Sequence, residues 1–160
     1  MKITKTNAMR QLDAAKIKYE IMEYTVDETD LSGTHIAEQI GLPCERVFKT
    51  LVTVGDKNGI NVICIPSNLE IDLKAAAVAT GNKRLEMLKT ADLLATTGYI
   101  RGGCSPVGMK KRFPTYIDAT AAEYEKITVS SGTRGMQLLL DPKELIKFTG
   151  AKLCSVTKNE

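Results

Sequence analysis

Two apolar, β-branched segments joined by a short polar link constrain the fold of this chain more than any other sequence feature. Residues 47–54 read VFKTLVTV, residues 60–65 read INVICI, and residues 55–59 between them read GDKNG. Short runs rich in Val, Ile and Thr are typical of β-strands, and a short link containing glycine is typical of a hairpin. We therefore expect an antiparallel β-hairpin over residues 47–65.

Apolar spacing and capping residues predict the remaining elements. The expected helices span residues 5–16, 34–40, 73–80 and 142–150, and residues 91–98 are expected to form a further short helix or turn. Asp72 and Asp141 are candidate N-caps, and Pro142 suits the first helical turn. Further strands are expected at residues 19–26, 115–119, 126–131, 136–140 and 153–157. This alternation favours an α/β fold in which helices surround a mixed, strongly curved, barrel-like sheet.

Length and composition indicate one globular domain. The chain has 160 residues, of which 43% are hydrophobic and 26% are charged, and a chain of this size can bury a substantial core. No low-complexity linker, repeat or break in composition divides it, so we expect a single domain over residues 1–160. No apolar run approaches the roughly 20 residues of a membrane helix, and no apolar signal segment is visible. We expect a cytoplasmic protein without a membrane partner.

The inventory of reactive side chains excludes several kinds of enzyme. His35 is the only histidine, so a Ser/His/Asp triad, a Cys/His dyad or a histidine-rich metal cluster would depend on that residue. It lies in a helical pattern, where a surface or capping position is more common. The four cysteines have no CxxC spacing, which favours reduced thiols over disulfides or zinc. No GxGxxG or P-loop motif is present, and we expect neither a metal nor a cofactor.

Lys49 lies within an otherwise apolar strand pattern. Alternation along the strand places Lys49 on one face with Val47 and Leu51. Thr50 and Phe48 then point to the opposite face, and both faces are expected to be buried. An ammonium group buried without a partner is costly, and an anionic or carbonyl-rich ligand would satisfy it. The alternative is a lysine on an edge strand, where its charge discourages aggregation.

Two turns rich in small residues are candidate ligand contacts. Residues 102–108 read GGCSPVG, and residues 130–135 read SSGTRG. In the first turn, glycines allow backbone N–H groups to approach a ligand closely, and such a turn can bind an ester or phosphate oxygen. In the second, Ser130 and Ser131 are candidate donors and Arg134 is a candidate anion contact. The two turns either flank one pocket or are unrelated surface loops.

Three sequence blocks together resemble the YbaK/EbsC family of free-standing aminoacyl-tRNA editing domains. The blocks are VFKTL at residues 47–51, TTGYIRGGCSPVGMKKR at residues 96–112 and TVSSGTRG at residues 128–135, and their order and spacing match the family over nearly the whole chain. The resemblance is greatest to the Cys-tRNA(Pro) deacylases of the YbaK type. The family is related to the editing insertion of bacterial prolyl-tRNA synthetases, and the resemblance implies its fold, a curved mixed sheet with surrounding helices.

The resemblance also implies a set of site residues. Lys49 matches the lysine on which family activity depends, and Gly102 and Gly103 match the glycine pair that approaches the aminoacyl ester. The further pocket positions are matched by Tyr24, Thr50, Ser105, Pro106, Gly108, Ser130 and Ser131. Three residues depart from the family pattern: Ser32 replaces a frequent aromatic residue, Ser131 replaces a glycine, and Gln137 lies near a position that is often acidic. These departures bear on substrate choice more than on fold.

The function implied by the resemblance is trans-editing, in which cysteine is removed from the 3′ end of mischarged Cys-tRNA(Pro). In the mechanism proposed for the family, the substrate thiol attacks its own ester carbonyl, expels the tRNA and leaves a cysteine thiolactone, without a metal, a cofactor or an enzyme histidine. A glycine turn and a lysine can supply the confinement and the stabilisation of oxyanion charge that this step needs. Cys104 lies at a position that the family motif leaves open, so the turn itself is expected to carry the chemistry.

The resemblance implies two partners, the aminoacyl-tRNA and the prolyl-tRNA synthetase that would supply tRNA specificity. The binding free energies of compact side chains such as those of cysteine and proline in one pocket differ by only about 1–3 kcal/mol, so a second, hydrolytic editing site is useful. The net charge of +3 permits an RNA partner without establishing one. Two alternatives remain open: a deacylase of another mischarged tRNA such as Ala-tRNA(Pro), with water as the nucleophile, or a non-catalytic nucleotide- or RNA-binding module.

Overall fold

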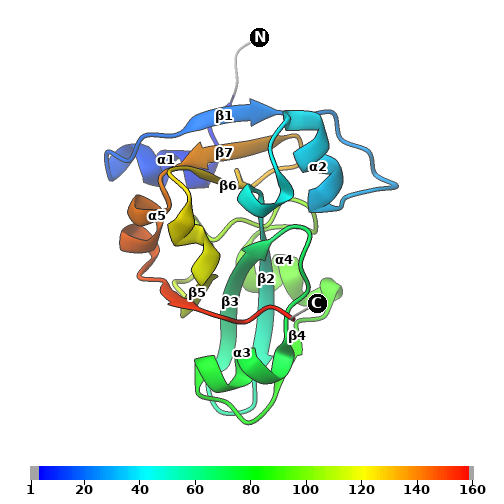
Figure 1. Cartoon of the computed structure of the whole chain (residues 1–160), viewed down its shortest axis with the longest axis vertical. Helices are drawn as coiled ribbons and strands as arrows, with labels where there is room; N and C mark the ends of the chain where they lie inside the picture. The colour runs from blue at the N-terminus through cyan, green and yellow to red at the C-terminus, as the bar shows by residue number, and fades with distance from the viewer. Residues whose placement is uncertain (1–3, 159–160) are drawn as a thin grey trace.

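The expected hairpin forms the longest strand pair of the structure, a computed structural model that describes residues 4–158. Strands β2 (Phe48–Gly55) and β3 (Gly59–Pro66) are antiparallel and paired along their whole length. Gly59 begins β3 with a φ of +76°, a left-handed conformation that favours glycine. In Figure 1 the hairpin runs down the centre of the molecule, with its turn at the lower end.

The hairpin is the centre of a five-stranded mixed sheet with the strand order β4-β2-β3-β5-β8. Strand β4 (Leu85–Met87) pairs antiparallel with β2, whereas β5 (Thr115–Asp118) and β8 (Lys152–Cys154) extend the sheet from β3 in parallel. The mixed character of the sheet agrees with the sequence prediction. Strand β4 was not predicted, because alternation is not recognisable over three residues.

A second sheet contains three antiparallel strands in the order β1 (Glu20–Glu23), β7 (Met136–Leu140) and β6 (Ile127–Ser130). A parallel bridge between Val47 and Thr128 joins it to the start of β2. The predicted barrel-like closure is wrong: the two sheets meet at this bridge but do not close into a barrel. Strand β6 meets β2 at one residue only, which provides too few ladder bonds to continue one sheet into the other.

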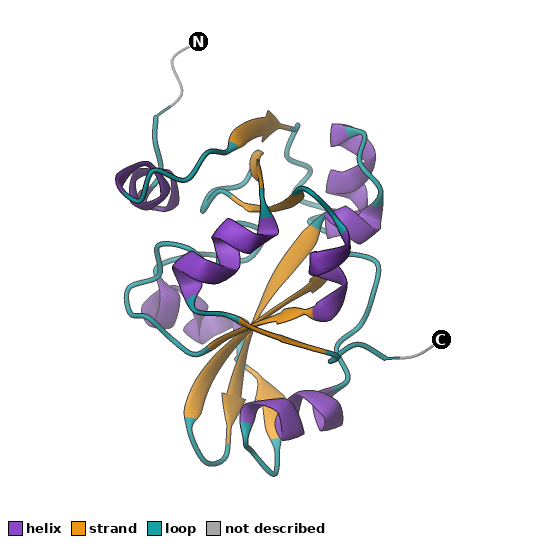
Figure 2. Ribbon diagram, turned by 60° about the vertical axis from the view of Figure 1, so that its left-hand side comes forward, coloured by secondary structure: helices purple, strands orange, loops and turns teal. Residues whose placement is uncertain are grey.

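Helices of eight residues each surround the sheets (Figure 2). They are α1 (Asn7–Ala14), α2 (Gly33–Ile40), α3 (Leu73–Thr80), α4 (Thr90–Thr97) and α5 (Pro142–Thr149), with short 3-10 helices η1 (Cys44–Arg46) and η2 (Ala119–Glu123). The predicted N-caps act as caps, since Asp72 accepts hydrogen bonds from the backbone N–H groups of Lys74 and Ala75, and Asp141 accepts one from Lys143.

Two apolar clusters determine where the two sheets meet. The larger cluster draws on α1, α5 and both sheets, and includes the fully buried Met9 and Leu138. The smaller one consists of Ile36, Ala37 and Val47, and packs α2 against the residue that precedes β2. Because Val47 also forms the bridge to β6, the N-terminus of α2 lies beside the junction of the two sheets.

Candidate active site

A cavity of about 320 Å³ lies at the junction of the two sheets. Its walls come from the start of α2, the first half of β2, the turn after α4, and strands β6 and β7. The cavity is lined by Leu31, Ser32, Gly33, Ile36, Val47, Phe48, Lys49, Thr50, Leu51, Ser67, Arg101, Gly102, Cys104, Ser130 and Gln137. Four of the site residues that the resemblance implies line this cavity, namely Lys49, Thr50, Gly102 and Ser130, and so do Ser32, Cys104 and Gln137, which were also named from the sequence. All three sequence blocks therefore contribute to one cavity.

The edge of β2 is unpaired where it borders the cavity. Strand β6 contacts β2 through Val47, and β4 pairs with it from Thr53 onward. Between these points the carbonyl of Val52 accepts a hydrogen bond from the N–H of Leu88, but no described strand pairs with this edge at residues 48–51. An unpaired edge presents backbone donors and acceptors. Lys49 and Thr50 lie on this open stretch.

Lys49 is half-buried in the cavity wall. Burial lowers the pKa of its ammonium group below the ordinary 10.5, while the charge of Glu70 acts in the opposite direction. Glu70 itself forms an ion pair with Lys158 at 3.3 Å, and among the described residues Lys49 has no carboxylate within ion-pair distance. The structure thus contains a feature that fits each interpretation of Lys49. The residue lies on an unpaired stretch of β2, and it also lines a cavity. A partly desolvated ammonium group without a protein partner is suited to an oxygen-rich ligand.

The first glycine turn brings two residues whose N–H groups lack a hydrogen-bond acceptor, Gly102 and Cys104, to the cavity wall over the described residues 4–158. Gly102 has a φ of +85°, so glycine is strongly favoured there. The N–H of Gly103 donates to the carbonyl oxygen of Ile100 at 3.0 Å and is therefore not free for a ligand. For the N–H groups of Gly102 and Cys104, no hydrogen-bond partner is found between residues 4 and 158. These two donors remain available to an oxygen in the cavity.

The second glycine turn packs directly on the first. The Nε of Arg134 donates to the carbonyl oxygen of Arg101 at 2.9 Å. A Cβ atom placed on Gly103 would lie 3.2 Å from the Cα atom of Thr133, so the two backbones are in close contact. The two glycine turns therefore pack together as one unit, and they are not two unrelated surface loops.

Six predicted site residues do not line the cavity. Gly103 is buried between the two turns, as just described. Ser105 and Ser131 are fully buried, and their hydroxyl groups bond locally: Ser105 Oγ accepts from the N–H of Val107, and Ser131 Oγ donates to the carbonyl of Thr133. Both serines therefore stabilise the turns rather than face the cavity.

The remaining three lie on other surfaces. Tyr24 packs on the cluster formed by α2 and Val47, and its N–H donates to the carbonyl oxygen of Gly135. Pro106 and Gly108 border a separate cavity of about 80 Å³. A Cβ atom on Gly108 would lie 2.5 Å from the hydroxyl oxygen of Tyr99, so this glycine permits close packing within the turn.

Cys104 lines the cavity, but its thiol is held in the protonated form. Burial raises the pKa of Cys104 to about 12. No Asp, Glu or His is among the described residues that line the cavity, so no general base adjoins this thiol. His35 lies on α2 with its ring Nε2 3.1 Å from the Gln39 side chain, as expected for a residue on a helix surface. A protonated thiol without a base is a poor nucleophile.

The sequence pointed to the start of α2 only through Ser32, which departs from the family pattern, and it did not indicate Gly33 or Ser67, the residue after β3. Ser32 caps α2 by accepting from the N–H of His35 at 3.3 Å, and both Ser32 and Gly33 line the cavity. A Cβ atom on Gly33 would lie 2.5 Å from the Cβ atom of Ser67, so the helix start packs tightly on the end of β3. The cap pattern predicts the helix, but nothing in it indicates which segment the helix contacts.

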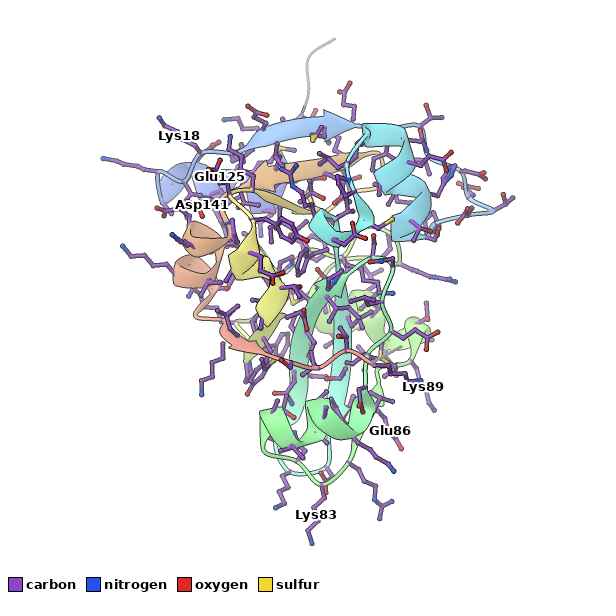
Figure 3. The ribbon with its side chains drawn as sticks, viewed as in Figure 1. Lys18, Lys83, Glu86, Lys89, Glu125 and Asp141 are labelled. Carbon is purple, nitrogen blue, oxygen red and sulfur yellow. The ribbon has the colours of Figure 1, made fainter. Side chains whose placement is uncertain are left out.

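A larger cavity of about 980 Å³ lies beside α1 and the start of α5. Its lining is Asp13, Lys16, Ile17, Lys18, Tyr19, Glu20, Lys126, Leu139, Asp141 and Glu144. Figure 3 labels Lys18 and Asp141 in this region, at the upper left, together with Glu125. The lining mixes both signs of charge and contains no residue from the three sequence blocks. The cavity of about 320 Å³ at the junction of the two sheets is therefore the better candidate for the active site.

Neither a metal cluster nor a membrane helix is found in the part of the chain that the structure describes. Over residues 4–158, no three His, Cys, Asp or Glu residues are grouped so that they could hold a metal ion. Likewise, no described helix has the length and apolar character needed to cross a membrane.

Comparisons with known proteins identify relatives of the whole chain. Residues 32–148 match the family model of the aminoacyl-tRNA editing domain. Over 156 residues, 98% of this chain and 95% of the relative, the chain is 51% identical to an Enterococcus faecalis (strain ATCC 700802 / V583) protein with the provisional name Cys-tRNA(Pro)/Cys-tRNA(Cys) deacylase EbsC. It is also 30% identical, over 69% of its length, to a segment that makes up 18% of a proline–tRNA ligase of Shouchella clausii (strain KSM-K16).

One solved structure shares the fold over almost the whole chain. It is described, again provisionally, as a trans-editing enzyme for prolyl-tRNA synthetase. The TM-score is 0.82 with 24% sequence identity, and the match covers 98% of this chain and 100% of the other. At this identity the likeness establishes the fold, with its two sheets and surrounding helices.

Proposed function

Because this chain belongs to the aminoacyl-tRNA editing domain family, we propose that it is a trans-editing deacylase that removes cysteine from mischarged Cys-tRNA(Pro). The family membership confirms the resemblance predicted from the three sequence blocks. The Enterococcus faecalis relative, 51% identical, is provisionally named a deacylase of Cys-tRNA(Pro) and Cys-tRNA(Cys). That name supports the same aminoacyl ester as the substrate here.

The observation that carries this proposal is the chemistry of the cavity lining. Lys49 and Arg101 are the charged residues among the lining side chains of the described chain, and no carboxylate or imidazole accompanies them. A deacylase that activates water usually needs a general base close to the ester. Cysteinyl-tRNA carries its own nucleophile, since its thiol can reach its own carbonyl. A cavity without a general base is therefore better suited to cysteine than to alanine.

The proposed reaction is an intramolecular transfer of the acyl group from oxygen to sulfur. The substrate sulfur attacks the ester carbonyl carbon, the bond from that carbon to the tRNA 3′-terminal ribose oxygen breaks, and the thiol proton ends on the departing oxygen. The products are the tRNA and cysteine thiolactone, which water then hydrolyses to free cysteine. Holding sulfur and carbonyl in contact lowers the entropic part of the barrier.

Three groups of the protein are suited to the charge that develops on the carbonyl oxygen. Between residues 4 and 158 the N–H groups of Gly102 and Cys104 have no hydrogen-bond partner, and Lys49 lines the same cavity. Donors that are already in place stabilise an oxyanion without reorganisation. Thr50 is not one of these groups. Its Oγ1 lies 3.7 Å from the sulfur of Cys64, and its side chain is on the opposite face of β2 from that of Lys49.

The proposed partners are the 3′ end of an aminoacyl-tRNA and prolyl-tRNA synthetase. A cavity of about 320 Å³ accommodates a small ligand such as an aminoacyl-ribose rather than a stem of RNA. Recognition of tRNA(Pro) would then come from elsewhere. The similarity to a segment of a proline–tRNA ligase supports a synthetase of this kind as the source.

A panel of charged tRNAs tests the proposal. Purified protein is incubated with Cys-, Ala- and Pro-charged tRNA(Pro), and loss of the ester is measured for the wild type, Lys49→Met and Lys83→Met. Lys83 lies at the far end of the hairpin, as Figure 3 shows, so it controls for loss of one positive charge. We expect rapid loss of cysteine, which Lys49→Met abolishes and Lys83→Met retains.

Two other outcomes would overturn the proposal. Preferential loss of alanine would indicate a deacylase that uses water. If no ester is cleaved but Lys49→Met weakens RNA binding, the protein is a non-catalytic binding module.

A further inference from the structure

Gln137 is a buried side chain whose amide nitrogen lacks a protein partner. It is only 4% exposed, yet it lines the cavity from β7. Its Oε1 accepts a hydrogen bond from Thr128 Oγ1 at 3.1 Å. Thr128 is fully buried, and between residues 4 and 158 its hydroxyl donates to no other acceptor. This bond sets the orientation of the amide and directs Nε2 away from Thr128.

The Nε2 atom is open to the cavity rather than sealed in protein. Within the described chain, Asn61 Oδ1 is the buried side-chain polar atom that lacks a partner, and it belongs to the far part of the hairpin. No hydrogen bond is found for Gln137 Nε2 in residues 4–158, so this atom owes its solvation to the cavity. A ligand that fills the cavity would remove this solvent contact, and the amide nitrogen would then need an acceptor on the ligand.

Ser130 adds a second donor beside Gln137. The two residues are cross-strand partners on β6 and β7. Ser130 is 7% exposed, and its Oγ accepts from the N–H of Gly132 at 3.2 Å, which leaves the hydroxyl hydrogen free to donate. Lys49 lines the same cavity from β2, so the lining contains several hydrogen-bond donors and favours an acceptor-rich ligand group.

We propose that Gln137 positions the substrate by donating a hydrogen bond from Nε2 to an oxygen atom of the 3′-terminal aminoacyl-ribose. This inference rests on the function proposed above. The oxygen is either the ester carbonyl or the free ribose hydroxyl, which share the acceptor chemistry that Nε2 requires. An ionised carboxylate in this place would offer acceptors only, so in this chain the donor to that oxygen comes from the amide nitrogen. The amide is thus a determinant of how the ester lies in the cavity.

Two variants separate the proposed donor from a merely structural role. Gln137→Glu keeps an oxygen that can accept from Thr128 but replaces the donor with an acceptor, and Gln137→Met removes both. Thr53→Val is the matched control, because Thr53 Oγ1 makes a buried hydrogen bond at 2.8 Å to the carbonyl of Asn61, away from the cavity. Thermal unfolding reports the structural effect of each change.

We expect Gln137→Glu and Gln137→Met each to lower kcat/KM on Cys-tRNA(Pro) by roughly tenfold to a hundredfold, as for loss of a hydrogen bond to a buried polar group. The Gln137→Glu rate should recover as the pH falls, because the protonated carboxyl group regains a donor. Thr53→Val should keep the wild-type rate even if its melting temperature falls. Wild-type rates in both Gln137 variants, or losses that only follow the melting temperature, would overturn the proposal.

A substrate that ends in 2′-deoxyadenosine distinguishes the two candidate oxygens. If the ribose hydroxyl is the acceptor, the wild type and the Gln137 variants should cleave this substrate at the same rate. If the ester carbonyl is the acceptor, the variants should remain slower than the wild type by the same factor as on the ribose substrate. An additional loss that appears only on the deoxy substrate would contradict both assignments. Failure of the proposed function is distinguishable, since the wild type itself would then cleave no ester.

Discussion

Gly103 lies so close to Thr133 that a Cβ atom on Gly103 would be 3.2 Å from the Cα atom of Thr133 and 3.3 Å from the backbone nitrogen of Arg134. Gly102, the preceding residue, lines the cavity instead. The two adjacent glycines therefore differ in role. Gly102 forms part of the cavity wall in a left-handed conformation, and Gly103 allows the two turns to pack together.

Gly103→Val is expected to destabilise the protein. The added side chain meets backbone atoms, which cannot move aside as a flexible side chain can, and overpacking of this kind costs about 1–3 kcal/mol. Urea denaturation measures the loss. Ala79→Val on the exposed face of α3 is the control, because it adds the two methyl groups of valine at a place where the side chain points to solvent. Equal stability of Gly103→Val and wild type would refute the close packing of the turns.

Cys104→Ser is expected to retain most of the deacylase activity. Burial raises the pKa of Cys104 to about 12, so at neutral pH the thiolate is a very small fraction and the cavity provides no carboxylate or imidazole to form it. Initial rates on Cys-tRNA(Pro) test this expectation. An inactive but folded Cys104→Ser, together with an acyl group trapped on the wild-type thiol, would instead demonstrate covalent catalysis by the enzyme.

Lys49 is expected to make stability depend on pH in the alkaline range. Burial lowers its pKa below 10.5, so between the lowered value and 10.5 the unfolded chain binds more protons than the folded one. Stability must rise with pH in that window, whereas below it the desolvation cost is present in full. The difference in unfolding free energy between wild type and Lys49→Met should therefore change in favour of wild type as the pH approaches 10.5. A difference independent of pH would mean that Lys49 is solvated.

Chelation is expected to leave the activity unchanged. Over residues 4–158 no group of three His, Cys, Asp or Glu could hold a metal ion, and a catalytic zinc usually has three protein ligands. The protein is dialysed against EDTA and then assayed with magnesium restored, because the tRNA itself requires that ion. A loss of activity that is restored by zinc but not by magnesium would contradict this expectation.

Local features of the fold were predictable because each depends on neighbours in the sequence. The hairpin follows from alternation and its polar link, and the caps Asp72 and Asp141 bond to N–H groups two or three residues away. The division into two sheets was not predictable. It depends on how far β6 pairs alongside β2. In the described residues the pairing is limited to a bridge between Thr128 and Val47, the residue before β2, and these two residues are distant in sequence.

The site was predictable in part for the same reason. Lys49 interrupts an apolar pattern and Gly102 belongs to a turn motif, so both are visible in the sequence, and both line the cavity. The sequence does not distinguish Gly102 from Gly103, since their different contacts come from the second turn. Ser67 and Arg101 line the cavity only because α2 and the second turn pack against them.

Whether the substrate supplies the nucleophile is decided by comparing Cys-tRNA(Pro) with Ser-tRNA(Pro) under single-turnover conditions. The two substrates differ by one atom, sulfur against oxygen, and a hydroxyl is a far weaker nucleophile than a thiol at neutral pH. We expect the wild type to cleave the cysteine ester rapidly and to lose nearly all of that rate with the serine ester. Equal cleavage of both esters would contradict this expectation and would indicate that the protein activates water.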